Sequence, residues 1–350
     1  MFKRQIWSTV RPGFEIVMQR RALGMSMAMR QPRISIRELR SQQQQQIRYE
    51  QGSQHYLFGK YRRMVPGTLL ASKPRPKEPS LECVPADIRR PPYAKTGIPP
   101  SWVTQVPILT PEEIDCMREA SAIARDALTL GGSMVKPGVC TEEIDRVIHA
   151  FIIAHGAYPS CLNYMGFPKS VCTSVNNVIA HGIPDSQELV DGDFINIDVT
   201  VYKNGFHGDT SATFAAGSVD VAGRKLMDAT KEALDLAIQV CGPGVPFRMI
   251  GETIEASIAP LGYTISEELT GHGLGRDFHQ NPLIYHHYNE EPEEMAPGMA
   301  FTIEPIVCQG VAKGILWPDG WTISTKDGGR SAQYEHTLVV TSNGVEVLTA

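Results

Sequence analysis

The chain from residue 110 onward alternates between amphipathic helical segments and short apolar runs. Thr110, Pro111 and Glu113 form a capping box with proline in the first turn, and apolar residues then recur every three or four positions. Gly131 and Gly132 end this expected helix. The same spacing predicts further helices at 141–156, 219–241 and 247–260. Apolar runs predict strands at 171–173, 194–201, 209–215, 299–308 and 334–341.

An internal repeat runs through these elements. Several pairs of matching positions are separated by the same 106 residues, which favours a duplicated αβ unit over coincidence. The pairs are Pro137–Val139 with Pro243–Val245, Ile144 with Ile250, Gly156 with Gly262, and Gly192–Asp198 with Gly298–Glu304. Two such halves would bring Asp198 and Glu304 to equivalent places, and both carboxylates would meet at one site if the halves face each other.

The first part of the chain differs from the rest in charge. Residues 1–50 contain ten Lys or Arg and three acids, whereas the whole chain carries −5. An Arg-rich, acid-poor start without a compact apolar segment is typical of a mitochondrial or plastid presequence; the alternative is a basic disordered tail without a targeting role. Residues 42–46 are a glutamine run, and 64–100 are rich in proline and basic residues. We therefore expect a presequence or disordered segment over 1–60, an extended linker over 61–97 and the catalytic domain over 98–350.

The composition limits the classes of protein that need to be considered. With 42% hydrophobic and 20% charged residues, the chain is long enough to bury a core, and we expect no membrane span and no nucleic-acid specificity. The seven cysteines are odd in number and widely spaced, with no C-x-x-C pair. A disulfide framework or a structural zinc site is therefore not expected.

Four acidic residues stand at the edges of apolar strands. They are Asp198, Asp209, Glu304 and Glu335. Each alone would more often be a capped turn or an ion-pair partner, but the matched pair at 198 and 304 favours a shared site. Four neighbouring carboxylates raise each other's pKa unless a cation compensates. Oxygen-rich ligands suit Mn, Mg or Fe(II), with Co or Zn also possible, and two such ions can polarise a carbonyl and activate water.

Three histidines accompany these acids. His272 lies in Gly271–Gly275, where glycine lets the backbone approach a site closely, and His279 follows shortly after. His181 precedes a Gly-Ile-Pro turn. A lone histidine is more often an ordinary loop residue, but the flanking residues favour a functional role. The Gly-x-Gly-x-Gly spacing lacks the context of a nucleotide-binding loop.

Taken together, these residues resemble type I methionine aminopeptidases of the M24 peptidase family. The resemblance covers about residues 90–350 and rests on three stretches that carry the matching motifs, at 167–184, 197–210 and 271–336. It implies an α+β, pita-bread (creatinase/aminopeptidase) fold with two pseudo-symmetric αβ halves around a dinuclear metal site. It also implies removal of the initiator methionine from proteins whose second residue is small.

The resemblance implies a role for each matching residue. The five metal ligands would be Asp198, Asp209, His272, Glu304 and Glu335, with Asp209 and Glu335 bridging two divalent ions (Mn, Fe(II), Co or Zn). His181 would lie beside the substrate amide, His279 would contact the scissile carbonyl oxygen, and Glu304 would also shuttle a proton. The methionine pocket would be lined by Cys161, Tyr164, Cys172, Phe278 and Trp321, a set that without the motifs would be read as core packing. Asn176, Val178 and Ser331 match a monovalent-cation site.

The branch of the family is indicated by what precedes the motifs. The basic leader and the segment at 90–93 are similar to the organellar branch, and the zinc module of cytosolic type I enzymes is missing because only Cys83 precedes residue 100. A mitochondrial location is favoured over the plastid by the arginine content. The expected partners are the N-termini of nascent polypeptides, with the ribosome as a candidate.

Three alternatives remain open at this point. An Xaa-Pro peptidase would usually add a folded N-terminal domain, for which the first 100 residues are too polar and irregular. A non-catalytic pita-bread binding module would usually lose metal ligands, whereas all five are present. A structural metal-binding protein would have no need for His181 and His279.

Overall fold

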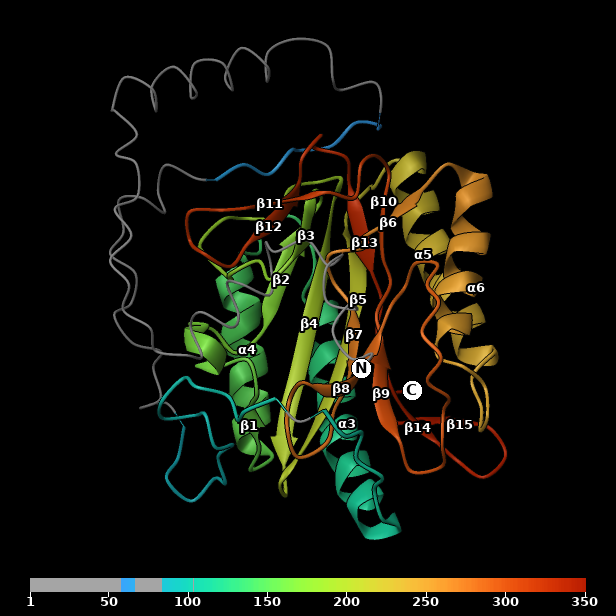
Figure 1. Ribbon diagram of the computed structural model, residues 1–350. Coiled ribbons are helices and arrows are strands. Elements are labelled where there is room, and N and C mark those ends of the chain that lie inside the picture. Colours follow the sequence, from blue (N-terminus) through green and yellow to red (C-terminus); the bar gives the residue numbers. More distant parts are fainter. Residues whose placement is uncertain (1–57, 67–83, 103) are drawn as a thin grey trace, which may run out of the picture. The chain divides into compact units, whose positions relative to one another are not determined.

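The computed structural model describes residues 58–66, 84–102 and 104–350, which belong to one compact unit, His55–Ala350 (Figure 1). The predicted presequence lies outside the described residues, apart from 58–60. Within the described part of the chain, no helix is both long enough and apolar enough to cross a membrane.

The first half of this unit is two helices packed against an antiparallel sheet. The helices are α3 (Pro111–Ser133) and α4 (Thr141–Ala154). The strands are β1 (Tyr158–Pro159), β2 (Cys172–Val175), β4 (Asp193–Lys203) and β5 (Phe206–Ala216), in the order β1-β4-β2 with β5 also paired to β4. The predicted capping box of α3 is confirmed. The Thr110 hydroxyl accepts from the Glu113 amide at 3.3 Å, and the Glu113 carboxylate accepts from the Thr110 amide at 3.0 Å.

The second half repeats this plan. Helices α5 (Val221–Gln239) and α6 (Arg248–Ile258) lie together at the right of Figure 1, and the 3₁₀ turn η4 (Ala259–Leu261) follows α6. Their sheet has the order β15-β14-β9-β7-β8. Its strands are β7 (Gly271–Gly273), β8 (Gln280–Ile284), β9 (Ala300–Ile303), β14 (His336–Val340) and β15 (Val345–Val347).

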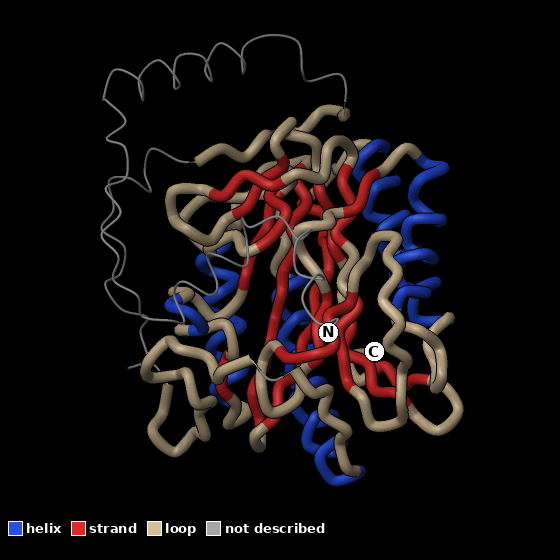
Figure 2. The backbone as a smooth tube through the Cα atoms, in the orientation of Figure 1, coloured by secondary structure: helices blue, strands red, loops and turns tan. Residues whose placement is uncertain are grey.

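Two three-stranded sheets and a 3₁₀ turn complete the described fold, which Figure 2 shows by type of element. One sheet has the order β13-β10-β6 and contains β6 (Thr264–Ile265), β10 (Ile306–Cys308) and β13 (Ser331–Gln333). The other has the order β11-β12-β3 and contains β3 (Val178–Ala180), β11 (Gly314–Leu316) and β12 (Ile323–Thr325). The 3₁₀ turn η3 spans Tyr164–Gly166.

The predicted duplication is visible in the order of elements, because a helix pair packs against strands in both halves. Asp198 lies in β4 and Glu304 directly follows β9, so the 106-residue offset relates the strands that carry the two acids. The strand expected over 299–308 is instead two strands, interrupted at Glu304 and Pro305. Proline cannot donate a ladder hydrogen bond, which accounts for the interruption beside the acid.

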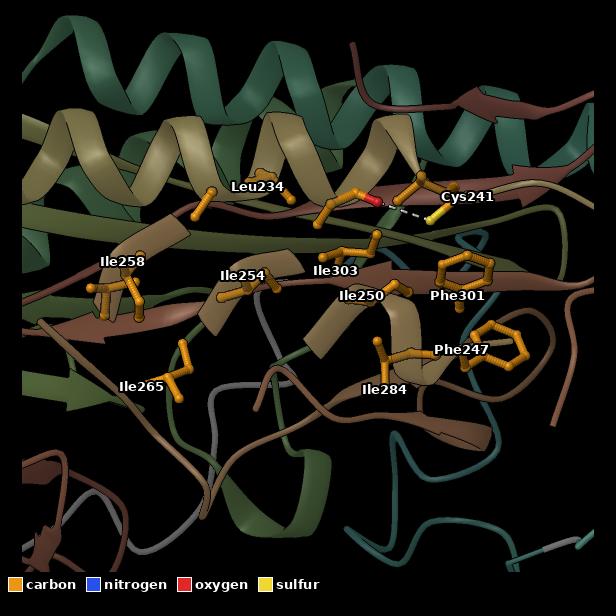
Figure 3. Packing of buried hydrophobic residues seen from close by; sticks show 14 of the residues in the cluster. Leu234, Cys241, Phe247, Ile250, Ile254, Ile258, Ile265, Ile284, Phe301 and Ile303 are labelled. Atoms are coloured by element: carbon orange, nitrogen blue, oxygen red, sulfur yellow. Dashed lines mark hydrogen bonds between the residues drawn. The ribbon is translucent and has the colours of Figure 1, made fainter. Parts of the chain in front are cut away.

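Each half has its own apolar core, and β5 closely approaches α3. The core of the second half gathers the inner faces of α5 and α6 against β9, with Ile250, Ile254 and Phe301 fully buried (Figure 3). In the first half, a Cβ at Gly208 would lie 2.4 Å from the backbone nitrogen of Ser121 in α3. Only glycine therefore fits at this contact, which is next to Asp209 in the sequence.

Segments before residue 98 also contribute to the unit. Met64, Val84, Ile88 and Tyr93 are buried. Asn177 accepts from the Met64 amide at 2.6 Å and donates to its carbonyl at 3.0 Å. The domain boundary at residue 98 stays a prediction, but part of the expected linker packs against the same body.

Replacing Ile254 by alanine should destabilise the second half. The change removes a fully buried side chain and leaves a cavity, which should lower the free energy of unfolding by about 2–5 kcal/mol. Leu261→Ala is the control, because Leu261 is 57% exposed and its loss should cost no more than about 0.5 kcal/mol. Urea unfolding followed by circular dichroism measures both; equal midpoints for the two variants would contradict this assignment of the core.

Candidate metal centre

Two of the predicted ligands come from one β-hairpin. Asp198 in β4 lies opposite Ser211 in β5, and Thr200 lies opposite Asp209. Residues directly opposite one another, and residues two apart on one strand, share a face of a sheet. The side chains of Asp198 and Asp209 therefore lie on the same face of the hairpin. Thr200 fixes the second of them by donating a 2.7 Å hydrogen bond to its Oδ1.

The remaining three predicted ligands come from the second half. His272 lies in β7, Glu304 follows β9, and Glu335 lies between β13 and β14. Glu335 is joined to the hairpin through its backbone, since it forms an antiparallel bridge with Ser211. This bridge places the last acid beside the first two.

The structure brings these residues together at one buried place. One ligand atom each from Asp209, His272 and Glu335 lie within 4.8 Å of one another, and all three residues are buried. His272 Nε2 is 3.8 Å from Asp209 Oδ2 and 3.6 Å from Glu304 Oε1. Asp198 is placed beside them by its register in the hairpin.

Burial and mutual repulsion govern the protonation of these acids. Desolvation by burial raises the pKa of Asp198 to about 7 and that of Glu304 to about 8. Burial, with the neighbouring carboxylates, also raises the pKa values of Asp209 and Glu335 well above their ordinary range. Among the described residues, no Lys or Arg forms an ion pair with any of the four. Within the described part of the chain, lysine and arginine side chains thus leave the charge of this cluster uncompensated.

The tautomer of His272 suits a metal ligand. Its Nδ1 lies 3.1 Å from the carbonyl oxygen of Gly273, and a carbonyl can only accept. The Nδ1 atom therefore carries hydrogen, and in the neutral ring Nε2 keeps its lone pair on the side of the carboxylates. Burial lowers the pKa of His272 to about 4, which keeps the ring neutral at pH 7.

Together these observations fit a divalent cation. The set consists of carboxylate oxygens and one imidazole nitrogen, which are hard and borderline ligands without a thiolate. A hydrogen-bonded outer layer orients them: Thr302 donates to Glu304 Oε1 at 2.8 Å, and Gln333 donates to Glu304 Oε2 at 3.2 Å. Metal sites commonly depend on such supporting contacts.

The residues predicted for the substrate pocket form one cluster beside this centre. Cys161, Tyr164, Cys172, Phe278 and Trp321 pack together with Tyr93, Phe167 and Ile183. Cys172 lies opposite Asp198 in the β2–β4 pair, so the apolar cluster directly adjoins the acids. Thioether, thiol and aromatic groups pack favourably with one another, and this wall suits a methionine side chain.

The two further histidines lie at this cluster. The centroid of the His279 ring is 4.1 Å from that of the His272 ring and 4.2 Å from that of the Phe278 ring. His181 has a φ of 56°, unusual for a residue other than glycine, and its ring is 6.3 Å from that of Trp321. The structure thus places both histidines against the wall of the predicted pocket.

The predicted monovalent-cation residues also lie close together. The Asn176 carbonyl accepts from the Ser331 amide at 2.9 Å, and Val178 pairs with Ser324. The Ser331 hydroxyl is buried without a hydrogen-bond partner among the described residues. The Ser331 hydroxyl oxygen, unpaired within the described residues, is free to bind a cation. The monovalent-cation site stays a prediction.

Sequence reasoning missed several residues that support the centre. Thr200 could have been found, because it is two positions from Asp198 on the same strand face. Thr302 offers the same signal, since it lies two positions before Glu304 and donates to it. The contact from Gln333 to Glu304 and the 2.7 Å bond from the Tyr93 hydroxyl to the Ser160 carbonyl join segments that only the tertiary fold brings together.

Comparison with known proteins gives a consistent result. Residues 115–342 match the model of metallopeptidase family M24. The chain is 48% identical to the human mitochondrial methionine aminopeptidase 1D, covering 77% of this chain and 81% of the relative. It is 46% identical to the chloroplastic/mitochondrial methionine aminopeptidase 1D of Arabidopsis thaliana, and the match covers 83% of this chain and 81% of that relative. The crystal structure of methionine aminopeptidase from Rickettsia prowazekii matches with a TM-score of 0.69 and 40% identity, covering 70% of this chain and all of that one.

These matches confirm the pita-bread fold, the peptidase class and the divalent-metal requirement of the family, and they favour an aminopeptidase over the Xaa-Pro and non-catalytic alternatives. The organelle names of the relatives support an organellar location. The chain therefore belongs to metallopeptidase family M24 and, within it, to the methionine aminopeptidases.

Proposed function

We propose that this chain removes the N-terminal methionine from newly made proteins whose second residue is small. The observation that carries the proposal is the buried cluster of Asp209, His272 and Glu335, with Glu304 and Asp198 beside it, next to a pocket of thiol and aromatic groups. Family membership supplies the reaction class, and the pocket supplies the preference for a thioether side chain.

The five residues Asp198, Asp209, His272, Glu304 and Glu335 would hold two divalent ions. When bound, such ions polarise a peptide carbonyl and lower the pKa of water. Glu304 is suited to carry a proton to the leaving amine, because its carboxyl oxygens are held in place by Thr302 and Gln333. His279 would donate to the carbonyl oxygen as negative charge develops there, and His181 would contact the substrate amide.

The finer assignments follow from the donor set and the relatives. Carboxylate-rich ligands with one imidazole suit Mn or Fe(II), and Co or Zn also fit. A monovalent cation held near Asn176, Val178 and Ser331 would brace the segments that carry the pocket. The substrates would be the N-termini of nascent polypeptides, met at the ribosome, and the arginine-rich leader favours the mitochondrion over the plastid.

Turnover by the full chain tests the proposal directly. After chelation and addition of Mn or Co, it should release methionine from Met-Ala peptides, with little release from Met-Leu and none of alanine from Ala-Pro. Release should be measured by chromatography, with the chelated protein as the control. Cleavage of Ala-Pro would identify an Xaa-Pro peptidase instead, and no turnover with any metal would favour a binding module.

Glu335→Gln should abolish turnover and weaken metal binding, because it replaces a ligand carboxylate by an amide of the same shape. We expect at least a hundredfold loss of kcat/KM, about 2.7 kcal/mol, and a lower metal content by mass spectrometry. Glu232→Gln is the matched control, since Glu232 is exposed and lies in α5, which carries none of the predicted ligands. Full activity of Glu335→Gln with saturating metal would contradict the ligand assignment.

Metal should stabilise the protein more at pH 8 than at pH 6. The folded-state pKa values of Asp198 and Glu304 are raised to about 7 and about 8, so folding favours their protonated forms. The contribution of the two protonated carboxyls to the free energy of unfolding is therefore present at low pH and is lost as pH rises from about 4 toward 8. Metal binding needs the deprotonated forms and offsets this loss. Thermal unfolding of chelated and Mn-loaded protein at the two pH values measures the difference; an equal increase in Tm at both would argue against a carboxylate-held cation.

A further inference from the structure

Tyr164 makes a contact that its place in the pocket does not require. Its hydroxyl lies 2.9 Å from Nδ1 of His279. Within the described part of the chain, this nitrogen is the sole recorded hydrogen-bond partner of the hydroxyl. A residue that only lined an apolar pocket could equally be phenylalanine, so the hydroxyl calls for a separate explanation.

The hydrogen bond limits where the proton of His279 can lie. A tyrosine hydroxyl carries one proton, and burial raises the pKa of Tyr164, so the hydroxyl stays protonated. If it donates to Nδ1, the neutral ring carries its hydrogen on Nε2. The other neutral tautomer would turn Nδ1 into the donor and leave the hydroxyl proton without an acceptor among the described residues. The pairing therefore favours the tautomer with hydrogen on Nε2.

The backbone around Tyr164 is held in an uncommon conformation. Its two neighbours, Asn163 and Met165, have φ values of 61° and 51°, in the left-handed region that residues other than glycine seldom adopt. Such strain persists only where surrounding contacts maintain it. Here the Asn163 amide donates to the Phe167 carbonyl at 2.8 Å, and the Asn163 side chain donates to the Ala94 carbonyl at 2.9 Å.

The ring of Tyr164 is also held between two aromatic neighbours. Tyr93 contacts it edge-on at 4.9 Å between ring centroids, and Phe278 lies at 4.8 Å. Tyr93 is itself buried and tied to the Ser160 carbonyl. Both Tyr93 and Ala94 precede residues 115–342, the part of the chain that matches the family model. A segment outside that match thus fixes the turn that presents the hydroxyl.

We propose that Tyr164 is a positioning residue, whose hydroxyl holds His279 in the tautomer that presents an N–H from Nε2 beside the candidate centre. His272 is the counterpart: its Nδ1 donates to the Gly273 carbonyl, and its Nε2 offers a lone pair. The two ring centroids are 4.1 Å apart. His272 would then offer a nitrogen lone pair to a cation, and His279 would offer an N–H to a developing oxyanion. This proposal rests on the proposed function, in which a carbonyl oxygen gains negative charge near His279.

Tyr164→Phe in the full chain isolates the hydroxyl, because it keeps the aromatic wall. With Met-Ala peptide and Mn, kcat should fall about tenfold or more while KM changes less than about twofold, since the affected interaction strengthens in the transition state. In a His279→Gln background, the same change should have no further effect on kcat. Tyr288→Phe is the control, as Tyr288 is 60% exposed. An unchanged kcat in Tyr164→Phe, or an undiminished effect in the His279→Gln background, would overturn the proposal.

Nitrogen-15 NMR of histidine-labelled protein reads the tautomer without relying on activity. The His279 signals are identified by their absence from His279→Gln. In the wild-type, metal-free protein, Nδ1 should give the shift of a nitrogen without hydrogen and Nε2 that of an N–H, and Tyr164→Phe should shift this balance. Hydrogen on Nδ1 in the wild type would refute the proposal even if Tyr164→Phe failed to fold. Absence of Met-Ala turnover by the wild type would instead count against the proposed function, and the NMR result would still decide the tautomer.

Discussion

The gathering of four carboxylates, two of them buried and two partly buried, is the constraint on which the site depends. Burial and mutual repulsion oppose their ionisation, and among the described residues no Lys or Arg forms an ion pair with them. Such a cluster is costly for folding unless a cation binds to it. Thr200 and Thr302 each donate a hydrogen bond to one carboxylate oxygen, of Asp209 and Glu304 respectively. These hydrogen bonds hold the two carboxylates in place at the candidate centre.

Neither half of the domain could build this centre alone. The β4–β5 hairpin of the first half supplies two acids on one sheet face, and the second half supplies a histidine and two more acids. The bridge between Ser211 and Glu335 joins the two sets through the backbone, which is less variable than a side-chain contact. Gly208 lets α3 pack closely behind the hairpin, so the strand that carries Asp209 has little room to shift. The duplication therefore has a direct chemical consequence, which is a candidate site built from residues of both halves.

The environment of the centre also distinguishes two histidines that look alike in sequence. The carbonyl of Gly273 directs one ring to offer a lone pair, and the hydroxyl of Tyr164 favours an N–H on the other. The strained turn at Tyr164 and the aromatic contact from Tyr93 connect the second ring to the segment before the family match. The N-terminal residues near Tyr93 are thus part of the architecture around the pocket as well as a connection to the leader.

Much of the fold and the candidate ligand set could be predicted from the sequence. Helix spacing, the capping box at Thr110 and the 106-residue repeat identified the elements and paired Asp198 with Glu304, because periodicity and local hydrogen bonding are properties of neighbouring residues. The motifs also singled out His272 and Glu335. The tertiary structure decided what depends on long-range contact: the packing of Met64 and Tyr93 onto the domain, and the proton position that Tyr164 favours on His279. These contacts join groups that lie far apart in the chain, as with Asn177 and Met64, and no local pattern records such a pairing.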